Sequence, residues 1–225
     1  MKTGQVPGWI LVGGFVLAGV AGFVNAVGLL GLSHPLSHVT GNASLFASSV
    51  VNANTDEMRV TGLLVLMFFA GAVISGFVVQ QSTARLGRRY GAALAVESAL
   101  LFAAAFFLHR GDAAGMYFAA VACGLQNAMV STYSGAIVRT THMTGVTTDI
   151  GIAVGHLLRG VAVPARYFLL LGVLLCGFVA GGMLGTKCFD RWQVEALIVP
   201  ALLTGVVGIA YFIYRHLNRP QSLPQ

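Results

Sequence analysis

Two short motifs in this sequence combine residue types that can hold a small polar group. His38-Val39-Thr40-Gly41-Asn42 and His142-Met143-Thr144-Gly145 each place a histidine two residues before a Thr-Gly pair. Threonine is a favourable residue at the start of a helix, so each motif predicts a helix N-terminus. The free N–H groups and the positive dipole end there attract anions and polar groups, so both motifs predict a binding site.

Three amides lie close to these motifs in otherwise apolar stretches. Asn25, Gln126 and Asn127 need partners there, and they either brace irregular segments of the chain or bind the solute directly. The candidate substrate-binding residues are Asn25, His38, Thr40, Gly41, Asn42, Gln126, Asn127, His142, Thr144, Gly145 and Thr148.

Two acids within apolar segments are candidates for proton coupling. An acid at membrane depth is costly and often marks an ion path or a proton relay, which points to Asp149 and to Glu97. A structural pairing of Asp149 with Arg139, His142 or His156 is the alternative. For Glu97, function and a place near the interface are equally open.

Polar residues also recur every four positions after each Thr-Gly pair. Such a stripe either packs against a neighbouring helix or lines a pathway, and both interpretations stay open. The stripes are Thr40, Ser44, Ser48 and Asn52 in one copy, and Thr144, Thr148, Ile152 and His156 in the other.

Other kinds of site lack their sequence signatures. No HExxH, GxSxG, phosphate-binding loop or dinucleotide fingerprint occurs, and Cys123, Cys176 and Cys188 show no metal-binding spacing. We therefore predict no catalytic residues, no metal and no cofactor. The basic residues are scattered among short connections, which argues against nucleic-acid binding.

The composition assigns these residues to a membrane environment. The chain is 56% hydrophobic and 9% charged, with a mean hydropathy of +0.81, whereas soluble domains carry about 25% charged residues. Apolar runs between polar breaks predict helices over 8–31, 40–53, 60–81, 90–108, 114–137, 144–159, 165–186 and 195–215. The second and sixth are too short to span a bilayer easily, and they carry the polar stripes.

An internal repeat organises these helices. GFVNA at 22–26 aligns with GLQNA at 124–128, and the two Thr-Gly motifs follow at nearly the same offset. The sequence thus predicts two repeats of one membrane domain, 1–110 and 111–225. Small residues at helix-packing spacing predict a tight helix contact in each half, namely Gly71, Ser75 and Gly76, then Gly177, Gly181, Gly182 and Gly185.

The distribution of basic residues favours one topology. If both short helices dip in and return, nine of the 13 Lys and Arg residues fall on one side of the membrane, whereas eight full spans give no bias. We therefore predict an all-α membrane protein with six transmembrane helices plus two short re-entrant or broken helices. Three spans per half make the repeats inverted. Eight full spans with parallel repeats is the alternative.

The motifs also resemble a known family. GFVNAVGLLG followed by SHVTGN, and CGLQNAM followed by TTHMTGVTTDIG, resemble the YoaK family of bacterial membrane proteins, which carry a domain of unknown function. The resemblance covers nearly the whole chain and implies a multi-span protein of the bacterial inner membrane, without an established substrate. That family often has an acid where Asn25 stands, so no charge-dependent role carries over to this position.

The sequence favours one function over two others. We expect a small secondary transporter or channel, without enzymatic activity, that binds a small polar or anionic solute between the two short helices. The lipid bilayer is the other expected partner, a homodimer is an alternative to a monomer, and both termini are expected in the cytoplasm. A non-transporting scaffold or sensor, and an intramembrane enzyme, are the competing hypotheses.

Overall fold

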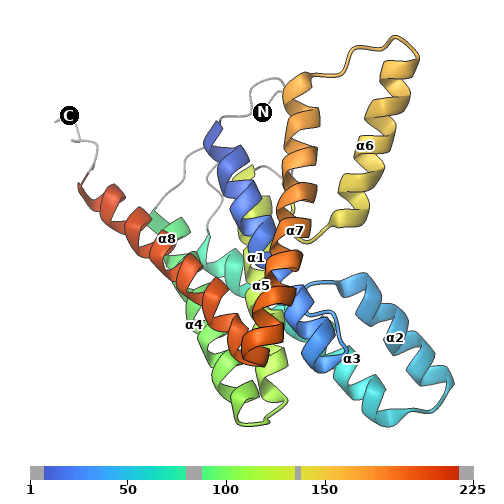
Figure 1. Cartoon of the computed structure of the whole chain (residues 1–225), viewed down its shortest axis with the longest axis vertical. Coiled ribbons are helices and arrows are strands. Elements are labelled where there is room, and N and C mark those ends of the chain that lie inside the picture. The colour runs from blue at the N-terminus through green and yellow to red at the C-terminus, as the bar shows by residue number, and fades with distance from the viewer. Residues whose placement is uncertain (1–7, 80–87, 135–137, 218–225) are drawn as a thin grey trace.

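The computed structural model describes residues 8–79, 88–134 and 138–217, and every regular element in these ranges is a helix (Figure 1). The elements are α1 (Gly8–Leu32), α2 (Val39–Val51), α3 (Thr55–Val78), α4 (Arg88–His109), α5 (Ala114–Ser134), α6 (Met143–Leu158), α7 (Ala165–Trp192), the 3-10 helix η2 (Gln193–Leu197) and α8 (Ile198–Leu217). The all-α prediction is confirmed. The last residues of the helix predicted over 114–137 lie outside the described residues.

Two predicted boundaries were wrong by about a turn or more. The helix expected from 60 begins at Thr55, because the Asn54 side chain accepts a hydrogen bond from the Glu57 N–H, at 3.2 Å, and caps the first turn. The helix expected to end at 186 continues to Trp192, since residues 187–192 include neither Gly nor Pro. It ends where Gln193 adopts a positive φ of 50°.

Four described segments are long and apolar enough to cross a membrane. They are Ile10–Leu32, Thr55–Val78, Arg89–His109 and Ala165–Tyr214, and the last contains both α7 and α8, which η2 separates. Helix α2 is apolar but shorter. These apolar helices indicate a membrane protein, in agreement with the composition.

The long helices pack in matched pairs. Helix α1 lies along α7, α3 lies along α5, and α4 packs against both α5 and α8. The short helices α2 and α6 pack on α3 and α7, respectively, and project toward the same side of the bundle in Figure 1. Each short helix therefore has a packed end and a projecting end.

Glycine lets α1 and α7 approach until their backbones touch. A Cβ at Gly22 would collide with the carbonyl of Phe178, and a Cβ at Gly181 would collide with the carbonyl of Gly19. Such contacts require small residues on both helices. The predicted tight contact is confirmed at Gly181, and Gly185 also lies against the α1 backbone.

The contact of α3 with α5 repeats this arrangement. A Cβ at Gly124 would collide with the carbonyl of Phe68, and a Cβ at Gly71 would collide with the carbonyl of Val121. Gly124 and Gly71 are the residues that the repeat aligns with Gly22 and Gly181. At Gly76 the prediction of a tight contact was wrong, because a Cβ added there would meet no neighbouring atom within 4 Å.

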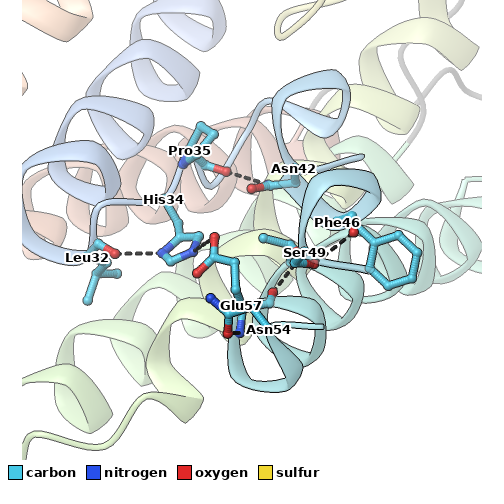
Figure 2. A network of polar contacts seen from close by, with 9 residues as sticks. Leu32, His34, Pro35, Asn42, Phe46, Ser49, Asn54 and Glu57 are labelled. Carbon is cyan, nitrogen blue, oxygen red and sulfur yellow. Dashed lines mark hydrogen bonds and ion pairs between the residues drawn. The ribbon is translucent and has the colours of Figure 1, made fainter. Parts of the chain in front are cut away.

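A polar network fastens α2 to its surroundings (Figure 2). The two ring nitrogens of His34 contact the carbonyl of Leu32 at 2.7 Å and the Glu57 carboxylate at 3.1 Å. The backbone N–H of Asn54 donates to the carbonyl of Ser49, at 2.9 Å, at the turn into α3. These bonds tie the segment before α2 to α1 and α3, and the last turn of α2 to the start of α3.

We expect Gly22→Ala to destabilise the protein by about 2 kcal/mol, because α1 and α7 must separate to admit a methyl group. Thermal unfolding of the purified protein in detergent measures this change. Gly13→Ala is the matched control, since it lies in the same helix with no atom within 4 Å of a Cβ. Equal melting temperatures for the two variants would contradict the close-contact explanation.

Candidate functional site

A polar cavity lies where α2 and α6 begin. Its volume is about 180 Å³, which is below the roughly 300–1,000 Å³ typical of sites for drug-sized ligands. The lining residues come from the two helix starts, from the segments before them, and from α3 and α5. They are Ser37, His38, Val39, Thr40, Phe68, Asn127, Arg139, Thr141, His142, Met143 and Thr144.

The start of α2 has no side-chain cap. His38 occupies the N-cap position, but its side chain makes no capping hydrogen bond, which leaves first-turn N–H groups free of a protein partner. The imidazole folds over Gly41, where a Cβ would lie 2.9 Å from Nδ1. The glycine of the Thr-Gly pair therefore makes room for the histidine ring.

The start of α6 repeats these features. His142 is the N-cap residue without a capping hydrogen bond, and its ring occupies the space that a Cβ of Gly145 would need. Both histidines are exposed and line the cavity, together with Thr40 and Thr144. The two motifs found in the sequence thus meet at one place.

Two asparagines hold the irregular segments that precede α2 and α6. The Asn25 carbonyl oxygen accepts from the Ser37 N–H at 3.3 Å and from its hydroxyl at 3.0 Å. The Asn127 carbonyl oxygen accepts from the Thr141 N–H at 3.5 Å. The structure therefore favours the bracing role for both amides, while Asn127 also reaches the cavity wall.

Arg139 gives the cavity a positive charge. Its side chain is exposed, and it makes no hydrogen bond or ion pair within the described ranges. The described lining contains no Asp or Glu. The cavity wall therefore combines one guanidinium with two helix N-termini and no negative group.

A buried chain of hydrogen bonds connects α4 to the segment before α6. Gln126 donates from Nε2 to Glu97 Oε1 at 2.9 Å, and its Oε1 accepts from the Thr140 hydroxyl at 3.0 Å. All three side chains are at most 1% exposed, and Glu97 Oε2 has no partner in the described part of the protein. Glu97 is thus linked to a residue that lies next to cavity-lining Arg139 and Thr141.

Other predicted site residues lie away from the cavity wall. Asn42 is buried and donates to the carbonyl of Pro35 at 2.7 Å, and the Thr148 hydroxyl donates to the Thr144 carbonyl at 2.9 Å. Asp149 is half-buried beside Tyr167 of α7.

The structural pairing considered for Asp149 is not seen. No ion pair joins it to Arg139, His142 or His156 among the described residues. Of the two acids, Glu97 has the hydrogen-bonded connection toward the cavity.

The polar stripe of α2 turns outward beyond Thr40. Ser44, Ser48 and Asn52 are exposed, with Ser44 bonded to the Thr40 carbonyl and Asn52 bonded to the Ser48 hydroxyl. The stripe is therefore satisfied within its own helix. Among the described residues, no three His, Cys, Asp or Glu side chains gather to hold a metal ion.

Sequence reasoning missed several lining residues. Ser37, Phe68 and Thr141 were not singled out, and Arg139 was considered only as a topological charge or a partner of Asp149. Thr140 was also overlooked as a bridge to Gln126. The run Thr140-Thr141 directly before His142 was the available signal, since two hydroxyls in an irregular apolar segment need partners.

We expect Gln126→Leu to destabilise the protein by roughly 2 kcal/mol, because it leaves Glu97 and Thr140 buried without a partner. Adding Glu97→Leu should restore part of this loss. The double variant should then lose about 1 kcal/mol less unfolding free energy than the two single variants lose together. Unfolding in detergent measures the cycle, with Met129→Leu as an apolar control on the same helix. Strict additivity would mean that the two side chains are not coupled.

Comparison with known proteins gives a family but no activity. The chain matches the model of a family described as a protein of unknown function, DUF1275, over residues 13–210. No curated protein matches, and no solved structure matches. Because the match covers most of the chain, this protein belongs to the DUF1275 family.

Proposed function

We propose that this protein is a small secondary transporter or channel, whose polar or anionic solute binds in the cavity between the starts of α2 and α6. The observation that carries the proposal is the convergence of two repeated motifs on one polar cavity of about 180 Å³ inside an apolar helical protein. Transporters with inverted repeats commonly bind solutes where broken helices begin near the midplane.

The proposal includes a specific membrane arrangement. Six helices cross, namely α1, α3, α4, α5, α7 and α8, while α2 and α6 enter and return on opposite sides. Two observations support this arrangement. The chain turns back after α1, so that Ser37 bonds to Asn25, and it turns back after α5, so that Thr141 bonds to Asn127. The first and third helices of each repeat also pack across the repeats, α1 on α7 and α5 on α3. The repeats are then 1–110 and 111–225, related by a two-fold axis in the membrane plane.

Proton coupling is assigned to Glu97 rather than to Asp149. The hydrogen bonds from Glu97 through Gln126 to Thr140 reach the segment that carries Arg139, whereas Asp149 faces α7. A change in the proton occupancy of Glu97 then alters the hydrogen bonds that position this segment. The proposed location is the bacterial inner membrane with cytoplasmic termini, as in the YoaK family, and the oligomer is either a monomer or a homodimer.

A scaffold or sensor is the second candidate. The hydrogen bonds that Asn25 and Gln126 make within the protein support it, because amides that already have partners can serve the fold rather than a solute. A scaffold has no need of a cavity whose arginine has no partner among the described residues, and for this reason transport remains the first proposal. An intramembrane enzyme would need a nucleophile and a base within reach of each other.

Cysteine labelling tests the arrangement. In a variant whose native cysteines are replaced by alanine, single cysteines at Asn54 and Gly160 mark the ends of α2 and α6. With re-entrant short helices and cytoplasmic termini, an impermeant thiol reagent added to intact cells labels position 54 and not position 160. With eight full spans both positions lie in the cytoplasm and neither is labelled. Absence of labelling at position 54 would therefore contradict the re-entrant arrangement.

Vesicle swelling tests transport. In proteoliposomes containing valinomycin, we expect at least one of urea, glycerol, potassium chloride, potassium nitrate or potassium succinate to enter faster than into protein-free vesicles. Thr144→Trp should block this entry by filling the cavity, whereas Thr147→Trp, on an exposed position of the same helix, should not. Entry no faster than into protein-free vesicles, with folded protein, would favour the scaffold.

A further inference from the structure

We infer that the cavity between α2 and α6 selects small organic carboxylates, with Arg139 as the counter-charge and Thr141 as a hydrogen-bond donor. This inference rests on the proposed function and narrows it to one class of solute. It follows from the helix-end donors, the positive charge of Arg139, the largely buried Thr141 and the apolar part of the cavity wall.

The donors come from two directions. Neither His38 nor His142 caps its helix, whereas the start of α3 is capped by Asn54. Uncapped first-turn N–H groups seek acceptors, and each helix end also carries roughly half a positive charge. An anion at the meeting point of α2 and α6 satisfies both helix starts at once.

The charge comes from Arg139. A guanidinium matches the two oxygens of a carboxylate in a bidentate arrangement, and Arg139 has no acidic partner in the described structure to compete with a ligand. A cation is disfavoured at this place, since the described wall offers no carboxylate and the arginine repels it. The site therefore discriminates by the sign of charge.

A largely buried threonine points to a ligand independently of the helix ends. Thr141 lines the cavity and is only 9% exposed, while its backbone N–H is bonded to Asn127. Its side-chain hydroxyl has no hydrogen-bond partner among the described residues. A hydroxyl is a hydrogen-bond donor, and a carboxylate oxygen in the cavity would accept its bond.

The remaining wall favours an organic anion over an inorganic one. Val39, Phe68 and Met143 contribute apolar surface to the same cavity. A sulfate or phosphate ion would present oxygens to this surface and leave them without partners. A short carboxylate instead places its charged end at the donors and its alkyl end against these three side chains.

Matched ligands test the inference on the full-length protein in detergent. Calorimetric titration compares propionate with its neutral counterpart propionamide, and with sulfate and phosphate. We expect propionate to bind at least about tenfold more tightly than propionamide, and sulfate and phosphate to bind more weakly than propionate.

Variants connect this binding to the named residues. Arg139→Gln should weaken propionate binding about tenfold or more, and Thr141→Val should weaken it by roughly threefold to tenfold. Arg159→Gln removes the same charge at the far end of α6, about 24 Å away along a helix of 16 residues, and should leave binding unchanged. Size-exclusion profiles identical to that of the unmodified protein establish that each variant is folded.

The outcomes separate this inference from the proposed function. Propionamide binding as tightly as propionate, or full affinity in Arg139→Gln, would overturn carboxylate selection and leave transport of a neutral solute intact. Tighter binding of sulfate or phosphate, or no binding of any probe, would also overturn it. The swelling experiment decides on transport independently of these results.

Discussion

The arrangement of this protein depends on satisfying irregular backbone inside an apolar bundle. A segment that leaves one helix and turns back exposes N–H and C=O groups, and lipid offers them no partner. Asn25 and Asn127 accept hydrogen bonds from the segments before α2 and α6, and they do so at matching positions of the repeat. Together with the bonds from Asn42 to Pro35 and from Thr140 to Gln126, these two amides fix the starting points of the short helices.

The second constraint is the close approach of helices that carry these amides. Gly22 and Gly124 each lie three residues before their asparagine and each contacts a backbone carbonyl of the partner helix. Each asparagine therefore lies one helical turn from a close backbone contact between two helices. The same short motif thus supplies both the packing contact and the hydrogen-bonding residue.

The sequence allowed prediction of the helical class, the repeated motifs and the meeting of His38, Thr40, His142 and Thr144, because periodicity and repetition are local signals. It did not allow prediction of the link between Glu97 and Gln126, which are 29 residues apart on different helices. It also misjudged α3, where charged residues obscured the cap formed by Asn54. Contacts between helices depend on how each helix is rotated about its axis relative to its neighbour, and local patterns in a single sequence do not determine this rotation.

The two halves differ in ways that assign them different tasks. Arg139 and Thr140 align with Pro35 and Leu36, and Gln126 aligns with Val24, so the charge and the bond between Thr140 and Gln126 belong to the second half, whereas Glu97 lies in the first. The first half instead holds its short helix with Asn42 and with the bond between His34 and Glu57. Each short helix packs on one long helix, and the contact of α6 with α7 is smaller than that of α2 with α3. If Glu97 carries the proposed proton coupling, its effect is therefore expected on the short helix that is less firmly packed.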